Sequence, residues 1–540
     1  MTSPSSNTNV HDNYLVLPKH AFENDHIGRL LSPVDLTTAK KVLRAGGQVT
    51  LPSQQLLNED VFEALSQGGD LFIFLSNGSS IKLKDAFEVN FKELPTSEWF
   101  LKTSEDIPAF KRAPREVPLS SPLYISQTQI KIEPIIWVNI RMVDCLVGWR
   151  TQVGQGTLHL FGFDYACLTY ANEEVRYLLE VYQSLGVDRA RPFGVSVVGY
   201  GPYGGMGYFH GTAINSTPGL QFVGTVDTNA ERRKAAREGF PGIKSVSTHR
   251  DLLELSEVEV VVVATPPSTH FTIAMESLSA GKHVVLEKPM CLTLTEADQL
   301  IALAQQNNVV LTVNQNRRWD QDFRAIRNLI SRGTLGEVFN IETFVGTFDH
   351  PCRAWHSDKD VSGGAAYDWG AHYVDWILLL YGEKPVEVTA IGHKRKWFEV
   401  SNLDQITIHM KFSKGREATF TQSDLAAVRK PKFYIQGTEG TVVGEYRPIS
   451  KESVSQHEGY VKETYHFAEA PAELHLTKYE GPGTLSSHTI ALPMPQRFGF
   501  WRNFADHIHL GAPLEVKTTQ VREVISILEE ANKATKTIQL

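Results

Sequence analysis

Phe193-Gly-Val-Ser-Val-Val-Gly199-Tyr-Gly201-Pro-Tyr-Gly204-Gly205-Met-Gly207 is the stretch that decides the fold of most of this chain. Its valine-rich start predicts a buried strand, and the glycines predict a tight turn into a helix. In a dinucleotide-binding loop the first glycine makes the turn, the second admits the pyrophosphate, and the third lets the helix pack closely. We expect Gly199 and Gly201 in the first two roles, and Gly204 or Gly207 in the third. A lone GxGxxG is weak evidence, but here a strand and a helix flank it as the mechanism requires.

Strands and helices alternate regularly from this motif to about residue 315, which predicts a parallel sheet built from βαβ units. The second strand, 220–226, ends in Asp227. A carboxylate there accepts both ribose hydroxyls and repels a 2′-phosphate, so it favours NAD over NADP. Nearby Arg232 and Arg233 leave NADP open, and Asp227 could instead cap the helix that follows.

A third strand, 260–264, breaks at a proline-containing loop, Thr265-Pro266-Pro-Ser-Thr-His270. Rigid loops at the carboxyl ends of parallel strands lie where cofactors bind. We therefore expect Thr265, Pro266 and His270 beside the cofactor, although His270 could simply start a helix.

Two further motifs carry chemistry. One is Lys282-His-Val-Val-Leu-Glu287-Lys288-Pro289, and the other is Asp368-Trp-Gly-Ala-His372. Residues four apart share one face of a helix, so Asp368 and His372 are expected to point the same way. A carboxylate beside an imidazole suits alcohol oxidation, because one can orient hydroxyls while the other accepts a proton. The alternative is a buried pair whose members only satisfy each other.

Together, the glycine loop, the Thr-Pro-Pro…His loop, Glu-Lys-Pro and Asp-Trp-Gly-Ala-His resemble the Gfo/Idh/MocA oxidoreductases over residues 193–540. The run Asn316-Arg-Arg-Trp-Asp320 is most similar to scyllo-inositol and related polyol dehydrogenases. The resemblance implies a Rossmann domain over 193–316 and a substrate and oligomerisation domain over 317–540. That second domain would carry a large open antiparallel sheet and form a homodimer or tetramer. Alternating strands near 338–344, 386–392 and 405–412, and a final helix over 519–535, agree with it.

The resemblance also implies roles for individual residues. A hydride passes from a carbinol carbon of a sugar, polyol or inositol to the nicotinamide ring. His372 removes the hydroxyl proton, Lys288 stabilises the oxygen, and Asp368 holds a neighbouring hydroxyl. Whether Lys288 or His372 is the base stays open. Glu287 is expected to face the cofactor, and the Lys288–Pro289 bond to be cis.

Four residues are candidates for the sugar site, and each could equally serve packing alone: Arg318, Trp319, Trp355 and His356. Two other functions remain open. One is an NAD-dependent glycoside-cleaving enzyme in which oxidation is transient, and the other is a non-catalytic NAD(P)-binding regulatory protein.

Bulk properties narrow the class of protein. The net charge of −8 gives no electrostatic footprint for nucleic acid or anionic membrane, and no apolar run reaches the length of a membrane span. The four cysteines match no metal-ligand spacing, so no metal is expected. A cytoplasmic protein with a small-molecule substrate follows.

The chain before the Rossmann strand is unusual for the family. We expect a disordered tail over 1–12 and an accessory α/β domain over 13–190, whose role the sequence does not indicate. Expected elements include a helix at 57–65, strands at 70–75 and 156–162, and a helix at 172–185.

Overall fold

The structure is a computed structural model. It describes residues 13–16, 31–51, 56–75, 80–83, 87–93, 98–103, 117–120, 123–128, 130–140, 143–163, 192–201, 205–217, 219–351, 354–455, 459–465, 468–493, 495–496 and 498–538. The expected tail, the helix expected at 172–185 and Gly204 lie outside these residues.

A six-stranded, wholly parallel sheet follows the order β15-β14-β13-β16-β17-β18. Its strands are β13 (Phe193–Val198), β14 (Leu220–Val226), β15 (Lys244–Val246), β16 (Val260–Val263), β17 (His283–Leu286) and β18 (Leu311–Val313). The connecting helices are α4 (Met206–Asn215), α5 (Ala230–Gly239), α6 (His249–Leu253), α7 (His270–Ser279) and α8 (Leu294–Gln306). The order reverses at β13, so the glycine loop that follows this strand lies at the topological switch point, where ligands of such sheets bind.

The following part is built on a nine-stranded sheet of order β28-β27-β24-β23-β19-β22-β21-β20-β29. Its strands are β19 (Val338–Gly346), β20 (Glu387–His393), β21 (Gln405–Lys411), β22 (Glu417–Ser423), β23 (Phe433–Gly437), β24 (Gly440–Glu445), β27 (Glu473–Gly481), β28 (Thr484–Ile490) and β29 (Lys536–Ile538). Most neighbours are antiparallel, but β19–β22 and β20–β29 pair in parallel. A separate hairpin joins β25 (Ile449–Ser455) and β26 (Gly459–Tyr465).

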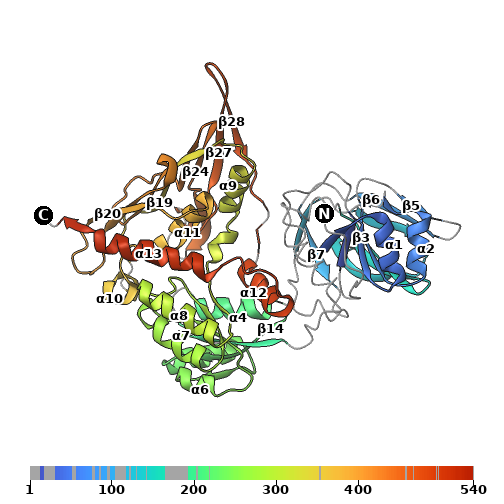
Figure 1. The fold of residues 1–540 in the computed structure, drawn as a ribbon, viewed down its shortest axis with the longest axis horizontal. Helices are drawn as coiled ribbons and strands as arrows, with labels where there is room; N and C mark the ends of the chain where they lie inside the picture. The colour runs from blue at the N-terminus through green and yellow to red at the C-terminus, as the bar shows by residue number, and fades with distance from the viewer. Residues whose placement is uncertain are drawn as a thin grey trace.

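The helices of this part are α9 (Gln321–Ser331), α10 (Lys359–Ser362), α11 (Gly370–Tyr381), α12 (Gly499–Leu510) and α13 (Thr518–Ala534). Among them, α11 and α13 pack against strands of this sheet. In Figure 1, α13 runs between the sheet and the Rossmann helices. One continuous hydrophobic core extends from the Rossmann strands through α11 to α13, so residues 192–538 form one packed unit.

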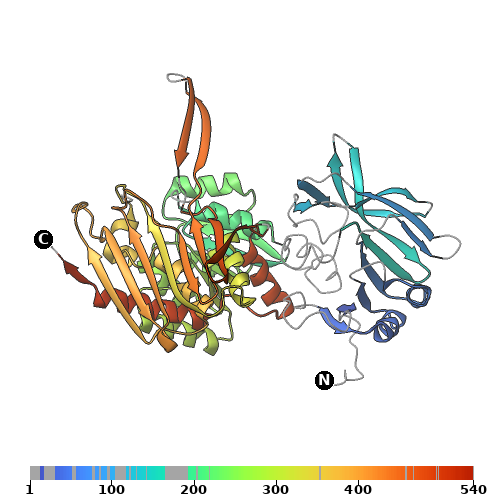
Figure 2. The same ribbon diagram turned by 90° about the horizontal axis from the view of Figure 1, so that it is seen from above.

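The N-terminal part forms a unit with its own core. Its main sheet has the order β2-β1-β3-β4-β12-β11-β10-β7-β8, with a small sheet β5-β6-β9 beside it. The strands are β1 (Asn13–Val16), β2 (Leu31–Val34), β3 (Gln48–Leu51), β4 (Asp70–Phe74), β5 (Ser80–Leu83), β6 (Phe87–Glu93), β7 (Glu98–Thr103), β8 (Val117–Ser120), β9 (Leu123–Thr128), β10 (Glu133–Ile140), β11 (Val143–Val153) and β12 (Gly156–Phe161). Helices α1 (Leu36–Arg44) and α2 (Glu59–Ser66) pack on one face, and Figure 2 shows this unit beside the Rossmann unit.

The predicted fold class is confirmed: a parallel Rossmann sheet, then a large mainly antiparallel sheet, preceded by an additional α/β unit. Two features depart from expectation. Half of the N-terminal sheet is antiparallel, and Asp368 precedes α11 instead of lying on it. No helix among the described residues is long and apolar enough to cross a membrane.

Candidate active site

Two described glycines of the loop leave open space beside the backbone. Gly201 and Gly205 have φ angles of 60° and 58°, and a Cβ atom added at either would meet nothing within 4 Å. Gly207 differs, because an added Cβ would lie 2.5 Å from the Tyr200 backbone. The close contact between strand and helix therefore falls on Gly207. Helix α4 begins at Gly205 without a side-chain cap, which leaves its positive end suited to a pyrophosphate.

Asp227 follows β14 and turns its carboxylate toward this loop. Its Oδ2 accepts a hydrogen bond from the Gly201 amide at 3.0 Å, and its Oδ1 accepts one from the Asn229 amide at 2.8 Å. Arg232 Nη1 lies 3.7 Å from the same Oδ2. The carboxylate is thus at the ribose end of the expected cofactor position, with one guanidinium beside it. These residues fit a nicotinamide dinucleotide.

His270 is fully buried. Its two ring nitrogens face the carbonyl oxygens of Pro289 and Thr265, each at 2.8 Å. The side chain therefore ties the loop that follows β16 to the cis Lys288–Pro289 loop that follows β17. In this position it supports the cofactor-facing loops instead of facing the cofactor, because no polar atom is left to do so. Thr265 Oγ1 accepts from Thr269 Oγ1 at 2.7 Å, and Pro266 precedes a single 3₁₀ turn.

Glu287 belongs to a buried network. Its Oε1 accepts from Asn314 Nδ2 at 2.8 Å and faces His210 Nε2 at 2.8 Å. Burial alone would raise the pKa of Glu287, but the hydrogen bonds with His210 and Asn314, together with the Lys288 charge, lower it below its usual value. The carboxylate is therefore ionised and links α4, β17 and β18 behind the loop.

Lys288 and Asp368 are in direct contact although they lie 80 positions apart in the sequence. Lys288 Nζ donates to Asp368 Oδ1 at 2.7 Å and to the Asp368 carbonyl oxygen at 3.2 Å. Burial would raise the pKa of Asp368, but the Lys288 charge and hydrogen bond lower it. The result is an ion pair, partly exposed, in which an ammonium donor is fixed next to a carboxylate acceptor.

His372 lies in the first turn of α11 and is buried. Its Nδ1 is 3.1 Å from Gln315 Oε1, while Gln315 Nε2 donates to the Ala371 carbonyl at 3.0 Å. The second bond fixes the amide so that its oxygen faces His372, and Nδ1 must then carry the proton. Burial and the positive charges of Lys288, Arg317 and Lys432 hold the pKa of His372 well below its usual value. His372 is therefore neutral, and its Nε2 atom carries the unprotonated lone pair.

The expectation that Asp368 and His372 share one helical face is wrong in detail. Helix α11 begins at Gly370, so Asp368 lies in the bend before it. Lys288 relates the two residues, because it binds Asp368 directly and its charge acts on His372.

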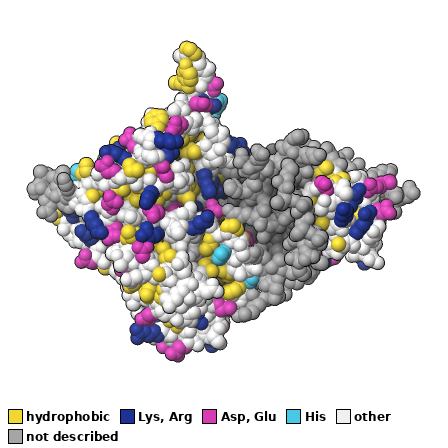
Figure 3. Space-filling model, in the orientation of Figure 1, with side chains coloured by type: hydrophobic (Ala, Val, Ile, Leu, Met, Phe, Trp, Pro, Cys, Tyr) yellow, Lys and Arg dark blue, Asp and Glu magenta, His cyan; other side chains and the backbone are white. Residues whose placement is uncertain are grey.

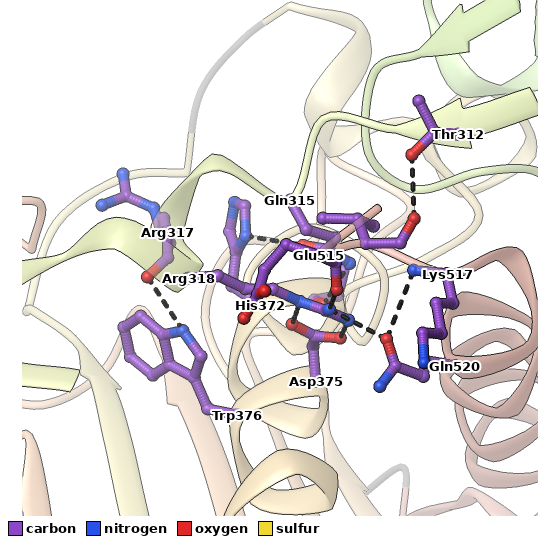
Figure 4. A network of polar contacts seen from close by, with 12 residues as sticks. Thr312, Gln315, Arg317, Arg318, His372, Asp375, Trp376, Glu515, Lys517 and Gln520 are labelled. Atoms are coloured by element: carbon purple, nitrogen blue, oxygen red, sulfur yellow. Dashed lines mark hydrogen bonds and ion pairs between the residues drawn. The ribbon is translucent and has the colours of Figure 1, made fainter. Parts of the chain in front are cut away.

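Arg318 has a different place from the one expected. Its guanidinium is bidentate to Asp375, with Nε–Oδ2 and Nη2–Oδ1 distances of 2.8 and 2.5 Å. Nη1 donates to the Glu515 carbonyl and to Gln520 Oε1 (Figure 4). Only 1% of the side chain is exposed, so Arg318 joins α11 to α13 and is not accessible to a sugar. Asp375 lies on α11 and is the acidic partner of this buried ion pair.

The remaining aromatic candidates divide into two groups. Trp319 packs edge-to-face against Phe500 and lies so close to Gly499 that a Cβ added there would be 2.2 Å from its ring. These contacts indicate a packing role for Trp319. Trp355 and His356 stack at 3.6 Å in a 3₁₀ turn. Burial and the Lys288 charge lower the pKa of His356, whereas the Asp368 charge opposes this shift. His356 is thus the sugar-site candidate that lies within electrostatic range of the Lys288–Asp368 pair.

Comparison with known proteins agrees with this geometry. The oxidoreductase family with an NAD-binding Rossmann fold matches residues 193–315, and the GFO/IDH/MocA C-terminal domain matches residues 323–443. An uncharacterised oxidoreductase of Schizosaccharomyces pombe is 30% identical over 322 residues, covering 56% of this chain and 85% of that protein. The chain belongs to the Gfo/Idh/MocA oxidoreductase family.

Two other Gfo/Idh/MocA-like proteins are informative. The scyllo-inositol 2-dehydrogenase (NADP⁺) of Bacillus subtilis is 28% identical over 354 residues, covering 64% of this chain and 95% of that protein. The crystal structure of an NAD-binding protein from Listeria innocua is 28% identical, with a TM-score of 0.54, and covers 64% of this chain and 95% of that one. The cofactor of this Gfo/Idh/MocA chain is accordingly a nicotinamide dinucleotide.

Sequence reasoning missed three residues of this Gfo/Idh/MocA site: His210, Asn314 and Gln315. No spacing rule identifies them, since each meets its partner across at least 27 positions. The available signal was their location, because His210 follows the glycine loop and the two amides follow β18, all at the sheet's cofactor edge. Among the described residues, no group of three His, Cys, Asp or Glu side chains is placed to hold a metal.

Proposed function

We propose that this protein is an NAD(P)-dependent dehydrogenase that oxidises a hydroxyl-bearing carbon of an inositol, a related polyol or a sugar. The observation that carries the proposal is the contact of Lys288 with Asp368 at 2.7 Å, at the entry to the helix that bears His372. Similarity to a scyllo-inositol 2-dehydrogenase supports the substrate class.

The bound nicotinamide ring supplies the hydride acceptor. Residues of the chain bind and orient the substrate and accept its proton. Lys288, whose ammonium has three donors and no acceptor, hydrogen-bonds the substrate oxygen and stabilises negative charge as it develops. Asp368 accepts a hydrogen bond from a neighbouring hydroxyl, which orients the ring of the substrate.

His372 is the general base in this proposal. Its neutral state and its protonated Nδ1 leave Nε2 as a lone pair that can accept the hydroxyl proton. Lys288 is a poorer candidate because its ammonium group has no lone pair to accept a proton and is already bonded to the Asp368 carboxylate. The sequence left these two residues as alternatives, and the amide of Gln315 favours His372.

The test is absorbance of the reduced nicotinamide while the protein is given inositols, aldoses and simple glycosides with NAD or NADP. We expect steady reduction with at least one polyol, and a fall in kcat of about 10²- to 10⁴-fold in Lys288→Ala and His372→Ala. Tyr434→Phe, a substitution in β23 of the large sheet, is the control and should leave kcat unchanged.

Two other outcomes would contradict the proposal. Release of an aglycone without net reduction would indicate glycoside cleavage by transient oxidation. Tight cofactor binding without turnover of any of these compounds would indicate a regulatory protein.

A further inference from the structure

Asp424 follows the last residue of β22 and is fixed by its backbone. Its amide donates to the Asp404 carbonyl at 2.8 Å, and its own carbonyl accepts from Trp397 Nε1 at 3.5 Å. Its side chain is half-buried and makes no hydrogen bond or ion pair with any residue in the described part of the chain. The carboxylate is therefore held in place without a donor of its own.

The direction of α11 brings Asp424 to the active site. This helix runs antiparallel to β22: Tyr381 Oη at its end donates to the Glu417 carbonyl at the start of the strand. At its beginning, a Cβ added to Gly370 would lie 3.2 Å from the Phe420 ring. Continuing past both contacts, Asp368 and Asp424 reach the same end of the sheet.

The electrostatics of Asp424 agree with this arrangement. Burial and the carboxylates of Asp404 and Asp368 raise the pKa of Asp424 to about 6; Asp349 acts in the same direction, and Lys394 opposes it. The charge of Asp368 is thus part of the surroundings of Asp424. Asp424 is thus a second acidic group at the Lys288–Asp368 site.

The neighbouring carboxylates already have partners. Asp368 binds Lys288, and Asp404 binds Lys394 Nζ at 3.0 Å and the amides of Arg395 and Lys396. Asp424 alone among these three lacks a donor. Asp424 thus has a half-buried carboxylate that can still accept hydrogen bonds, and substrate hydroxyl groups are donors of the right kind.

We propose that Asp424 binds a hydroxyl group of the substrate and thereby selects polyols that carry this hydroxyl. The inference rests on the function proposed above. It assigns Asp424 to recognition, whereas Lys288 and His372 act at the carbon that reacts.

The test combines Asp424→Asn with a series of deoxy substrates in which one hydroxyl of the active polyol is missing. The full-length protein with NAD or NADP is used, and kcat, KM and the calorimetric Kd of each polyol are measured. We expect KM and Kd to rise about 10- to 100-fold in Asp424→Asn while kcat changes less than about threefold. For one deoxy substrate, wild type and variant should bind equally, because the hydroxyl that Asp424 recognises is absent.

Asp349→Asn is the matched control. Asp349 is an exposed carboxylate within electrostatic range of Asp424, so its loss changes the local charge without removing the proposed partner. Unchanged affinity in Asp424→Asn, or an equal loss with every deoxy substrate, would overturn the inference. Polyol binding that depends on Asp424 but leads to no hydride transfer would support the inference and refute the dehydrogenase instead. Failure of every polyol to bind would overturn both.

Discussion

The amide of Gln315 holds His372 in the tautomer that a proton acceptor needs. Because burial and three nearby cations keep the pKa of His372 well below 6.5, the base form persists as the pH falls through neutrality. The activity of the wild type should therefore fall only when the pH drops below 6.5 toward that lowered pKa. This is the direction expected for a histidine that must be neutral to act.

Gln315→Glu should shift the acid side of the pH profile of kcat to higher pH. A carboxylate 3.1 Å from Nδ1 stabilises the imidazolium, so we expect the inflection in kcat to rise by about one pH unit or more. The measurement is kcat against pH at saturating substrate. Gln436→Glu is the control, because Gln436 also accepts a side-chain hydrogen bond but lies on β23 of the large sheet. An unchanged profile in Gln315→Glu would mean that His372 is not the titrating base.

The sequence was sufficient to identify some of the candidate site residues but not to predict the position of others. Lys288, Asp368 and His372 belong to short motifs, and in the structure Lys288 contacts Asp368 while its charge acts on His372. Arg318 could not be placed, because its partners Asp375, Glu515 and Gln520 lie 57 to 202 positions away. Buried pairing of that kind depends on packing and leaves no periodic trace in the sequence.

At the scale of the elements, the position of α4 depends on Gly207, which has no side chain. Gly207→Ala would place a Cβ 2.5 Å from the Tyr200 backbone and move α4 away from the glycine loop. We expect cofactor affinity to fall about tenfold or more, measured by quenching of intrinsic fluorescence on titration with NAD and NADP. Gly239→Ala at the end of α5 is the control, since its Cβ would make ordinary contacts at 3.5 Å. Equal affinity in both variants would show that the loop tolerates this displacement.

The Arg318–Asp375 pair joins two helices, so its loss should affect stability. Asp375→Ala leaves a buried guanidinium unpaired, and we expect the free energy of unfolding in urea to fall by about 3–5 kcal/mol. The double variant Arg318→Met with Asp375→Leu should lose much less, because it leaves no buried charge. Glu387→Ala, which breaks an exposed pair with Lys411, should cost less than about 1 kcal/mol. A similar loss in all three variants would contradict this account.

Element types were predictable where periodicity is strong. The Rossmann strands, α2 and α13 appear close to the expected positions, since valine runs and a 3.6-residue repeat mark them clearly. The start of α11 was misplaced by two residues because Asp368 and Trp369 fit a first helical turn equally well. The antiparallel half of the N-terminal sheet could not be foreseen, because strand direction is decided by tertiary pairing.

At the scale of the whole molecule, the described residues include one hydrophobic core in the N-terminal part and another in the part from Phe193 onward, and these two cores share no residue. The described residues of the N-terminal core are all drawn from residues before Phe161, and those of the other core from Phe193 onward. On the face shown in Figure 3, basic and acidic side chains are interspersed over the coloured residues. Because the two cores share no residue, we expect the two units to unfold in separate transitions.

Leu158→Ala tests this separation. Leu158 is fully buried in the N-terminal core, so its truncation should lower the stability of that unit by about 2–5 kcal/mol. Calorimetry should show one transition shifted to lower temperature and the other unchanged, with NAD affinity preserved. Leu528→Ala in α13 is the reciprocal variant and should shift only the other transition. A joint shift of both transitions would show that the units are coupled.

The contacts of α13 and of the residues just before it affect the order in which the chain folds during translation. Glu515 and Gln520 hold Arg318, the Val516 carbonyl accepts from Thr312, and Glu529 accepts from the Leu294 amide at 2.9 Å. The glycine loop and its strands can collapse while translation continues, since N-terminal segments fold first. The contacts of the buried Arg318, however, can form only after residues about two hundred positions later have been synthesised. The nucleotide-binding strands can therefore form during synthesis, whereas the buried contacts of Arg318 are completed only after residues 515–520 have left the ribosome.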